Sequence, residues 1–162
     1  MKEIPLNNGM VTLVDDGDYE MLARNKWQCA ARSTKGLYYA YRMITRGGRS
    51  RNISMHRLIM GVTDPRVEID HKDLNGLNNQ KSNLRVATRS QNGANCRKCS
   101  KPTSSQFKGV YFRKNRNRWH ARIKINGQRK SLGFYVNEED AARAYNNAAV
   151  IAFGEFARLN QV

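Results

Sequence analysis

Short runs in which apolar and polar residues alternate fill the first fifty positions of the chain. MVTLVD alternates, DDGD interrupts it, and LYYAYRMITRGGRSRNISM places two strand-like runs around Gly47 and Gly48. Alternation with a period of two is typical of strands with one buried face, and paired glycines between such runs favour a tight hairpin. We therefore predict β-hairpins over residues 1–50. MHRLIMG follows as a short buried helix, in which His56 is expected to be structural.

The last third of the chain has a different pattern. FKGVYFRK, RWHARIKI and QRKSLGFY are strand-like runs separated by NRN and by NG, and NG is a strong hairpin signal. NEEDAARAYNNAAVIAFG then reads as a helix, with Asn137 as N-cap, acidic residues in the first turn and Gly154 as the stop. The pattern predicts a three-stranded antiparallel sheet packed on one helix, and an α+β fold for the chain.

CRKCSKPTSSQ lies between these regions and is polar, basic and without apolar periodicity, as linkers are. We place a basic linker at 96–105, between an N-terminal domain of residues 1–95 and a C-terminal domain of residues 106–162. Cys96 and Cys99 form a CxxC in this linker. A structural zinc site needs four ligands, so this lone pair favours reduced thiols over zinc.

Composition indicates where in the cell the protein is found and what kind of molecule it binds. No apolar run approaches the roughly 18–20 residues needed to cross a bilayer, and MKEIPLNNGM lacks the apolar core of a signal peptide. We expect a cytoplasmic protein with no membrane partner. The formal net charge is +16, and residues 74–137 hold fifteen Lys or Arg and no Asp or Glu. Because this field of one sign lies on strand-like segments rather than on an amphipathic helix, nucleic acid is the favoured partner.

VEIDHKDLNGLNNQKSNLRVATRSQN holds groups that suit a metal centre acting on phosphate. Asp70 is a hard oxygen donor, and Asn92 can add a neutral oxygen from a helix that Thr88 and Gln91 begin as a capping box. In a strand, His71 points to the opposite side from Asp70, where it can accept a proton from a water that attacks phosphorus.

Asparagines in the same stretch have two expected uses. Asn83, on the returning strand, is suited to hold His71 in the needed tautomer through its oxygen. Asn75, Asn78 and Asn79 lie in LNGLNN, where asparagine is favoured because it tolerates the left-handed backbone. We assign these three residues to turn formation and give them no catalytic role.

The Asp70-His71 pair, Asn83 in SNLRVAT and Asn92 in RSQN resemble the HNH, or ββα-metal, nuclease family, and within it the homing endonucleases of phages and introns. The resemblance covers about residues 1–95 and implies a ββα-metal HNH motif in the N-terminal domain. By that resemblance, Asp70 and Asn92 bind a divalent ion, His71 is the general base and Asn83 positions it. Many members have histidine at the position of Asn92, and the oxygen donor here favours Mg²⁺ or Mn²⁺.

Residues 106–160 resemble the AP2 DNA-binding domain, in which the three-stranded sheet lies in the major groove of DNA. The resemblance implies DNA contacts from matching basic and aromatic positions, namely Arg113, Trp119, Lys124 and Arg129. Arg122, where the family often has glutamate, adds charge to the same face. Trp119 would fill the core between sheet and helix equally well. Tyr111 and Ser131 depart from the family pattern, so base preference is not carried over.

These observations predict a monomeric, homing-type endonuclease that hydrolyses a phosphodiester of double-stranded DNA, with the AP2-like module aiding site selection. With one metal centre per chain, a nick is the simplest product. Two alternatives stay open at this point: a DNA-binding regulator with an inactive HNH site, and an RNA-binding protein.

The acid-free basic stretch predicts binding that weakens steeply with salt. Each neutralised phosphate releases counterions, so about 6–10 phosphate contacts would cost about 10³–10⁵ in affinity between about 50 and 200 mM salt. Fluorescence anisotropy with a labelled duplex at several salt concentrations measures this slope. An affinity that does not change with salt would show that residues 74–137 are not the binding surface.

Overall fold

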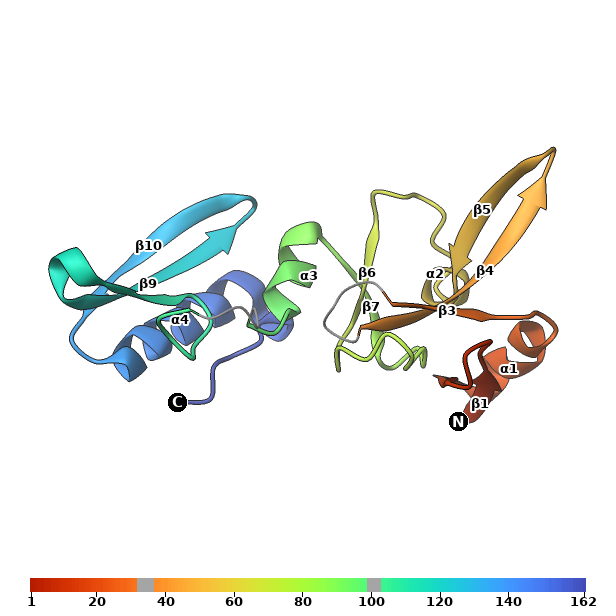
Figure 1. Cartoon of the computed structure of the whole chain (residues 1–162), viewed down its shortest axis with the longest axis horizontal. Coiled ribbons are helices and arrows are strands. Elements are labelled where there is room, and N and C mark those ends of the chain that lie inside the picture. The colour runs from red at the N-terminus through yellow and green to blue at the C-terminus, as the bar shows by residue number, and fades with distance from the viewer. Residues whose placement is uncertain (32–36, 99–102) are drawn as a thin grey trace. The chain divides into compact units, whose positions relative to one another are not determined.

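The structure of the chain is a computed structural model, which describes residues 1–31, 37–98 and 103–162. The chain divides into two compact units, Met1–Ala87 and Thr88–Val162. Figure 1 shows the elements of both units in sequence colours.

Small antiparallel sheets and short helices build the N-terminal unit. In chain order its elements are β1 (Lys2–Pro5), β2 (Val11–Val14), α1 (Asp16–Ala23), β3 (Gln28–Ala31), β4 (Tyr38–Arg46), β5 (Arg49–Ser54), α2 (Met55–Ile59), β6 (Glu68–His71) and β7 (Leu84–Ala87). β1 pairs with β2, β4 lies between β3 and β5, and β6 pairs with β7. The predicted hairpin around Gly47 and Gly48 and the helix in MHRLIMG are confirmed.

The helix α1 differs from the prediction, which had strands and turns alone in the first fifty residues. Asp15 takes the N-cap position, Asp16 and Asp18 lie in the first turn, and Leu22 is fully buried. Acidic side chains near a helix N-terminus stabilise it through the helix dipole. The polar DDGD sequence therefore begins a helix here and does not close a hairpin.

The core of the N-terminal unit collects apolar residues from most of its elements: Ile4, Leu6, Val14, Leu22, Trp27, Ala40, Met55 and Leu77. Trp27 is buried, and its indole Nε1 donates to the carbonyl of Leu22 at 2.9 Å, so its one polar atom is satisfied. Leu77 belongs to the long loop between β6 and β7, so the core also holds that loop.

Strand β2 fixes the loop between β6 and β7 through both backbone and side chain. Leu13 N donates to Leu77 O, and Asn79 N donates to Leu13 O, each at 2.8 Å. The buried hydroxyl of Thr12 also donates to Leu77 O, at 2.7 Å. A loop that would otherwise be mobile is therefore tied to a strand about 65 residues earlier in the chain.

The C-terminal unit contains one three-stranded sheet and the long helix that covers it. Its elements are α3 (Arg89–Asn95), β8 (Val110–Arg113), the 3-10 turn η1 (Lys114–Arg116), β9 (Arg118–Ile125), β10 (Gln128–Tyr135), α4 (Glu138–Phe153) and the 3-10 turn η2 (Gly154–Phe156). β9 is the central strand and both pairings are antiparallel. The predicted sheet and helix are confirmed, and Asn126 and Gly127 form the predicted hairpin turn, both with positive φ.

The compact units divide before α3, whereas the sequence predicts domains at 1–95 and 106–162. The buried Ala94 of α3 packs in one apolar cluster with Ile123, Tyr145 and Phe153 of the C-terminal unit. The assignment of separate functions to the two predicted domains stays a prediction. None of the helices in the described ranges is both long enough and apolar enough to cross a bilayer.

Gly109 illustrates how closely sheet and helix approach in the C-terminal unit. Its φ is +79°, and a Cβ there would lie 2.1 Å from the ring of Tyr145 and 2.7 Å from the carbonyl oxygen of Arg122. The carbonyl of Gly109 also accepts from Arg122 N, at 2.9 Å. Residue 109 therefore needs glycine both for its backbone conformation and for space.

Replacing Gly109 with Ala should destabilise the protein by about 3 kcal/mol or more, because left-handed strain and overpacking add together. Gly127→Ala is the matched control: its φ is +85°, but a Cβ there meets nothing within 4 Å. The control should lose only the backbone part, about 1–2 kcal/mol. Urea denaturation of both variants measures the difference, and equal losses would show that close packing at Gly109 contributes nothing.

Candidate functional site

Asp70 and His71 are the last residues of β6 and are both buried, with 3% and 5% of their surface exposed. The register of β6 with β7 sets Asp70 opposite Arg85. Arg85 donates from Nε and Nη2 to Asp70 Oδ2, at 2.9 and 2.8 Å. A carboxylate this deeply buried needs such compensation, because removing its charge from water is otherwise costly.

A chain of hydrogen bonds determines which nitrogen of His71 carries the proton. The single hydrogen of the Thr12 hydroxyl goes to Leu77 O at 2.7 Å, so Thr12 Oγ1 accepts from Asn79 Nδ2 at 2.8 Å. This orients the Asn79 amide and turns its Oδ1 to His71 Nε2, 3.1 Å away. Because a carbonyl oxygen only accepts, Nε2 carries the hydrogen and Nδ1 is the basic nitrogen of the neutral ring.

The environment of His71 also sets its protonation state. Burial is the largest influence and lowers the pKa of His71 below its ordinary value of 6.5, although the Asn79 bond and the charges of Asp73 and Asp70 act in the opposite direction. The rings of Tyr39 and His56 pack edge-on against it, with centroids 5.7 and 5.2 Å away. The imidazole is therefore neutral at neutral pH and able to accept a proton.

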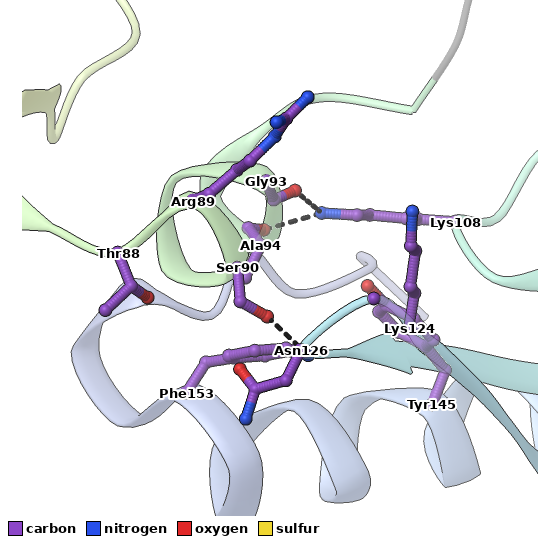
Figure 2. Close-up of a pocket in the computed structure, with 11 residues that line it drawn as sticks. Thr88, Arg89, Ser90, Gly93, Ala94, Lys108, Lys124, Asn126, Tyr145 and Phe153 are labelled. Atoms are coloured by element: carbon purple, nitrogen blue, oxygen red, sulfur yellow. Dashed lines mark hydrogen bonds between the residues drawn. The ribbon is translucent and has the colours of Figure 1, made fainter. Parts of the chain in front are cut away.

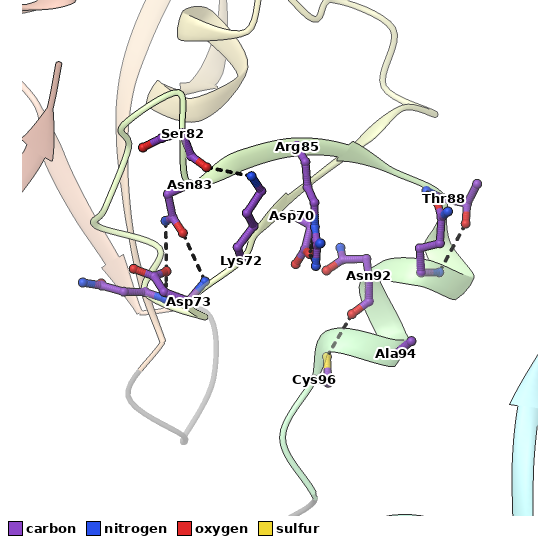
Figure 3. A network of polar contacts seen from close by, with 12 residues as sticks. Asp70, Lys72, Asp73, Ser82, Asn83, Arg85, Thr88, Asn92, Ala94 and Cys96 are labelled. Carbon is purple, nitrogen blue, oxygen red and sulfur yellow. Dashed lines mark hydrogen bonds and ion pairs between the residues drawn. The ribbon is translucent and has the colours of Figure 1, made fainter. Parts of the chain in front are cut away.

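Asn83 holds the loop rather than the imidazole, which corrects the sequence-based assignment (Figure 3). Its Nδ2 donates to Asp73 Oδ1 at 2.9 Å and to Asn78 O at 2.8 Å, and its Oδ1 accepts from Asp73 N at 3.1 Å. The contact to His71 comes instead from Asn79, a residue that the sequence analysis assigned to turn formation alone. The fully buried Asn79 has this second use because β2 orients its amide.

Asp73 is the charged centre of this loop. Burial acts to raise its pKa, but hydrogen bonds from Asn75 N, Asn78 Nδ2 and Asn83 Nδ2 outweigh burial and lower the pKa below 3.8. Asp73 is therefore a carboxylate at neutral pH, and its charge favours the protonated form of His71. The asparagines of the loop fix a negative charge near the imidazole as well as forming the turn.

Asn92, the second predicted metal ligand, lies on α3 in the C-terminal unit, whereas Asp70 belongs to the N-terminal unit. The predicted capping box is confirmed: Gln91 N donates to Thr88 Oγ1 at 3.2 Å, and Thr88 N donates to Gln91 Oε1 at 2.8 Å. The box fixes the first turn of α3, on which Asn92 lies. That Asp70 and Asn92 share one ion stays a prediction.

Lys108 holds the other end of α3 (Figure 2). Its Nζ donates to the carbonyls of Ala94 at 2.5 Å and Cys96 at 2.8 Å, and more weakly to Gly93 at 3.5 Å. An ammonium at a helix C-terminus satisfies carbonyls that have no partner within the helix and complements the dipole. Burial is the largest influence on Lys108 and lowers its pKa.

A cavity of about 730 Å³ lies between α3, the β9–β10 turn and α4. At its edge Asn126 N donates to Ser90 Oγ at 2.9 Å (Figure 2). At the other end of α3, Arg158 N donates to Ala94 O at 3.3 Å. Together with Lys108, these bonds attach both ends of α3 to the C-terminal unit. The orientation of Asn92 is therefore set by the fold that carries the basic sheet.

The candidate ligands fit a hard divalent ion. Asp70 and Asn92 offer carboxylate and carboxamide oxygens, which Mg²⁺ and Mn²⁺ accept, and Mg²⁺ usually keeps several waters beside one or two protein ligands. Across residues 1–31, 37–98 and 103–162, no group of three or more His, Cys, Asp or Glu is suited to hold a metal. Arg85 already binds Asp70 Oδ2, so an ion at Asp70 would share the carboxylate with a guanidinium.

The CxxC is only half described, because Cys99 lies outside the described residues. Cys96 Sγ donates to Asn92 O at 3.5 Å. Cys29 and Cys96 are free thiols.

The outer face of the C-terminal sheet gathers the predicted DNA-binding arginines and lysine. Ala121 and Ile123 of β9 are buried on the α4 side, so the alternating residues Arg122 and Lys124 point away from the helix. Arg129 is opposite Lys124 and shares its face. By the same register, Arg113 lies opposite Arg118 on the outer face.

Aromatic rings are interleaved with these charges on the outer face. His120 stacks on Phe134 with centroids 4.4 Å apart, Arg116 lies 4.5 Å over Phe134, and Arg122 lies 4.0 Å over Tyr111. Such stacking holds long basic side chains against the sheet, which reduces the entropy lost when they bind an anion.

Trp119 lies on the other face of the sheet, and the prediction of a DNA contact from it is not supported. It is opposite Phe112 and Tyr135 in the register, packs edge-on against Phe112 at 5.0 Å and joins the apolar cluster under α4. The core-filling alternative explains its position, because residues 119, 121 and 123 share one face of β9.

Comparison with known proteins finds similarity to HNH endonucleases in the stretch that contains the candidate site. Residues 56–94 match the family model described as HNH endonuclease, and this stretch includes all four residues of the predicted catalytic set. A protein of Acanthamoeba polyphaga mimivirus, described as an uncharacterised HNH endonuclease, is 42% identical over 106 residues, which is 65% of this chain and 53% of the relative. The chain spans about half the length of this curated relative. Residues 56–94 are therefore similar to the HNH endonuclease family.

Three residues of the site were not found from the sequence: Arg85, Asn79 and Lys108. Arg85 could have been found from the sequence. The strands before and after the loop pair as a hairpin, and this pairing sets Arg85 opposite Asp70. The amide of Asn79 is oriented by Thr12, which is 67 residues away in the sequence. Lys108 donates to backbone carbonyl groups, which do not depend on residue type. Neither leaves a local signal in the sequence.

Replacing Asn79 with Ala removes the acceptor on His71 Nε2. The bond favours the protonated ring, so its loss should lower the pKa of His71 further. The free energy of unfolding should fall by about 1–3 kcal/mol, because His71 and Thr12 lose a buried partner. Asn83→Ala is the control, since Asn83 bonds to the loop and should leave the pKa of His71 nearer to the wild-type value. NMR titration of the imidazole tests both, and an unchanged pKa in Asn79→Ala would refute the assignment.

Proposed function

We propose that this chain is a homing-type endonuclease that hydrolyses a phosphodiester bond of double-stranded DNA with Mg²⁺ or Mn²⁺ as cofactor. The observation that carries the proposal is the neutral, buried His71, with Nδ1 as its basic nitrogen, next to Asp70 along β6 in the stretch that matches HNH endonucleases. A basic imidazole next to a hard oxygen donor is the pair that metal-assisted hydrolysis of phosphate needs.

His71 is the general base of this reaction. Its Nδ1 takes a proton from a water, the water oxygen forms a bond to phosphorus, and the bond from phosphorus to the leaving oxygen breaks on the opposite side. Asn79 keeps the hydrogen on Nε2 and so keeps Nδ1 basic. The negative charges of Asp70 and Asp73 stabilise the imidazolium after it has taken the proton.

Asp70 and Asn92 are the residues that would hold the divalent ion. When bound, such an ion neutralises charge on the phosphate and on the leaving oxygen. Arg85 orients the Asp70 carboxylate through two hydrogen bonds to Oδ2. Lys108 and the capping box of Thr88 and Gln91 fix the helix that carries Asn92.

The C-terminal sheet binds the DNA backbone in this proposal, as an AP2-like module that aids site selection. Arg113, Arg122, Lys124 and Arg129 share one outer face with no acidic residue among them. Contacts to phosphate fix the register of the protein on DNA but carry no sequence information themselves. We propose a monomer that acts in the cytoplasm of the host cell and nicks one strand. The viral origin of the relative is in keeping with a mobile element.

Incubation of plasmid and genomic DNA with the protein and Mg²⁺ or Mn²⁺ should produce nicks, and a chelator should abolish them. His71→Ala should lower the rate by about 10²–10⁴-fold, the usual contribution of a positioned base. Since only the neutral ring accepts a proton, the wild-type rate should be constant around pH 7 and fall as the pH drops through the lowered pKa of His71. Glu20→Gln, on the exposed side of α1, is a control that should cleave normally.

Two outcomes would contradict the proposal. If His71→Ala cleaves as fast as the wild type, His71 is not the base. If the wild type binds duplex DNA but never cleaves it with either ion, the chain is a DNA-binding regulator with an inactive HNH site.

A further inference from the structure

The hairpin of β4 and β5 has two chemically different faces. Directly paired residues of antiparallel strands point to the same side, and so do residues two apart along a strand. The pairs Arg42–Ile53, Ile44–Arg51 and Arg46–Arg49 therefore share one face. The opposite face holds the neutral residues Tyr41, Met43, Thr45, Ser50, Asn52 and Ser54. All the charge of the hairpin is on one side.

Three arginines near the tip of this face are exposed: Arg46, Arg49 and Arg51. With Ile44 they line a shallow groove of about 320 Å³. There is no Asp or Glu from residue 37 to residue 63. Among the residues that the structure describes, none of the three has a carboxylate partner, whereas the surface acids Asp16, Glu20 and Asp64 of the same unit each form an ion pair.

The base and the tip of the hairpin are both held. Arg42 donates through Nη1 to Asn25 Oδ1 and lies over the ring of Trp27, 5.8 Å from its centroid, so it is anchored to the core. Gly47 and Gly48 have φ of +56° and +72°, which a tight hairpin turn requires. On the neutral face, Thr45 Oγ1 and Ser50 Oγ are 2.8 Å apart and hydrogen-bonded. The arginine face is therefore presented on a preorganised support.

We propose that the face formed by Arg46, Arg49 and Arg51 is a second DNA-binding surface, which grips backbone phosphates from the N-terminal unit. Exposed guanidiniums this close repel one another, and a polyanion relieves that repulsion. Guanidinium forms paired hydrogen bonds with phosphate oxygens, and the major groove of B-DNA admits a two-stranded β-ribbon. This inference rests on the proposed function only in taking double-stranded DNA as the partner.

The role proposed for this surface is contact with phosphates, with which guanidinium forms paired hydrogen bonds. Its contribution to affinity should therefore fall with salt.

The test compares the full chain with the triple variant Arg46→Gln, Arg49→Gln, Arg51→Gln. Affinity for a labelled duplex is measured at several salt concentrations with divalent ions chelated, so that no cleavage occurs. Three lost phosphate contacts should make the slope of log K against log salt less steep by about 2.7, so that the variant loses about 40-fold less affinity than the wild type between about 50 and 200 mM.

A matched control removes the same charge from another surface of the N-terminal unit, with Lys2→Gln, Arg24→Gln and Lys26→Gln. These residues are exposed, and their variant should keep the wild-type slope. A second control, Met43→Ala with Asn52→Ala, changes a cross-strand pair on the neutral face of the same hairpin and should also keep the slope. Circular dichroism confirms that each variant is folded.

The outcomes separate this inference from the proposed function. If the arginine variant keeps the wild-type slope, or if the Lys2, Arg24 and Lys26 control loses as much, the inference is wrong while DNA cleavage stands. A reduced slope that appears with duplex RNA but not with duplex DNA would also overturn it. If the wild type binds no duplex DNA at all, it is the proposed function that fails.

Discussion

The hydrogen bonds that run from the Leu77 carbonyl through Thr12 and Asn79 to His71 are the constraint on which the candidate site depends. Thr12 has one hydroxyl hydrogen and gives it to Leu77, and this choice decides every later donor and acceptor in the chain. Because Thr12 and Asn79 are fully buried, no water can replace a lost bond, and breaking one costs about 1–3 kcal/mol. The tautomer of the imidazole is thus fixed by a strand that belongs to the core.

Fixed charges around the imidazole complete this electrostatic arrangement. Asp73 and Asp70 favour an imidazolium, whereas burial opposes it more strongly, so the ring starts neutral and is stabilised after it takes a proton. Arg85 binds Asp70 Oδ2 from the opposite strand and limits how much negative charge the site presents. The guanidinium compensates the buried carboxylate, which would otherwise be costly to remove from water.

Local signals in the sequence predicted the elements whose formation depends on neighbouring residues. The hairpin turn was predicted from Asn126 and Gly127, and the capping box from Thr88 and Gln91. The helix α4 was predicted from Asn137 and the acidic residues that follow it. The assignments of two side chains depended instead on distant contacts. Asn79 and Asn83 are both asparagines of one loop, and only the tie to Thr12 decides which of them contacts His71. The sequence allowed Trp119 to contact DNA or to fill the core. The register of β9 places it on the side of the sheet that faces α4.

The packing of α3 explains why the predicted domains, residues 1–95 and 106–162, differ from the two compact units. Helices of seven residues are unstable alone, so α3 depends on tertiary contacts. Lys108 contacts its C-terminus, and Asn126 N of the β9–β10 turn donates to Ser90 Oγ near its N-terminus. Ala94 of the helix packs in the apolar cluster with α4. The residue that the HNH resemblance makes a metal ligand, Asn92, is therefore supported by the unit whose sheet carries the arginines. Within that unit, anything that loosens Lys108 loosens the helix of the candidate ligand, so the C-terminal unit positions that helix in addition to the binding role proposed for its sheet.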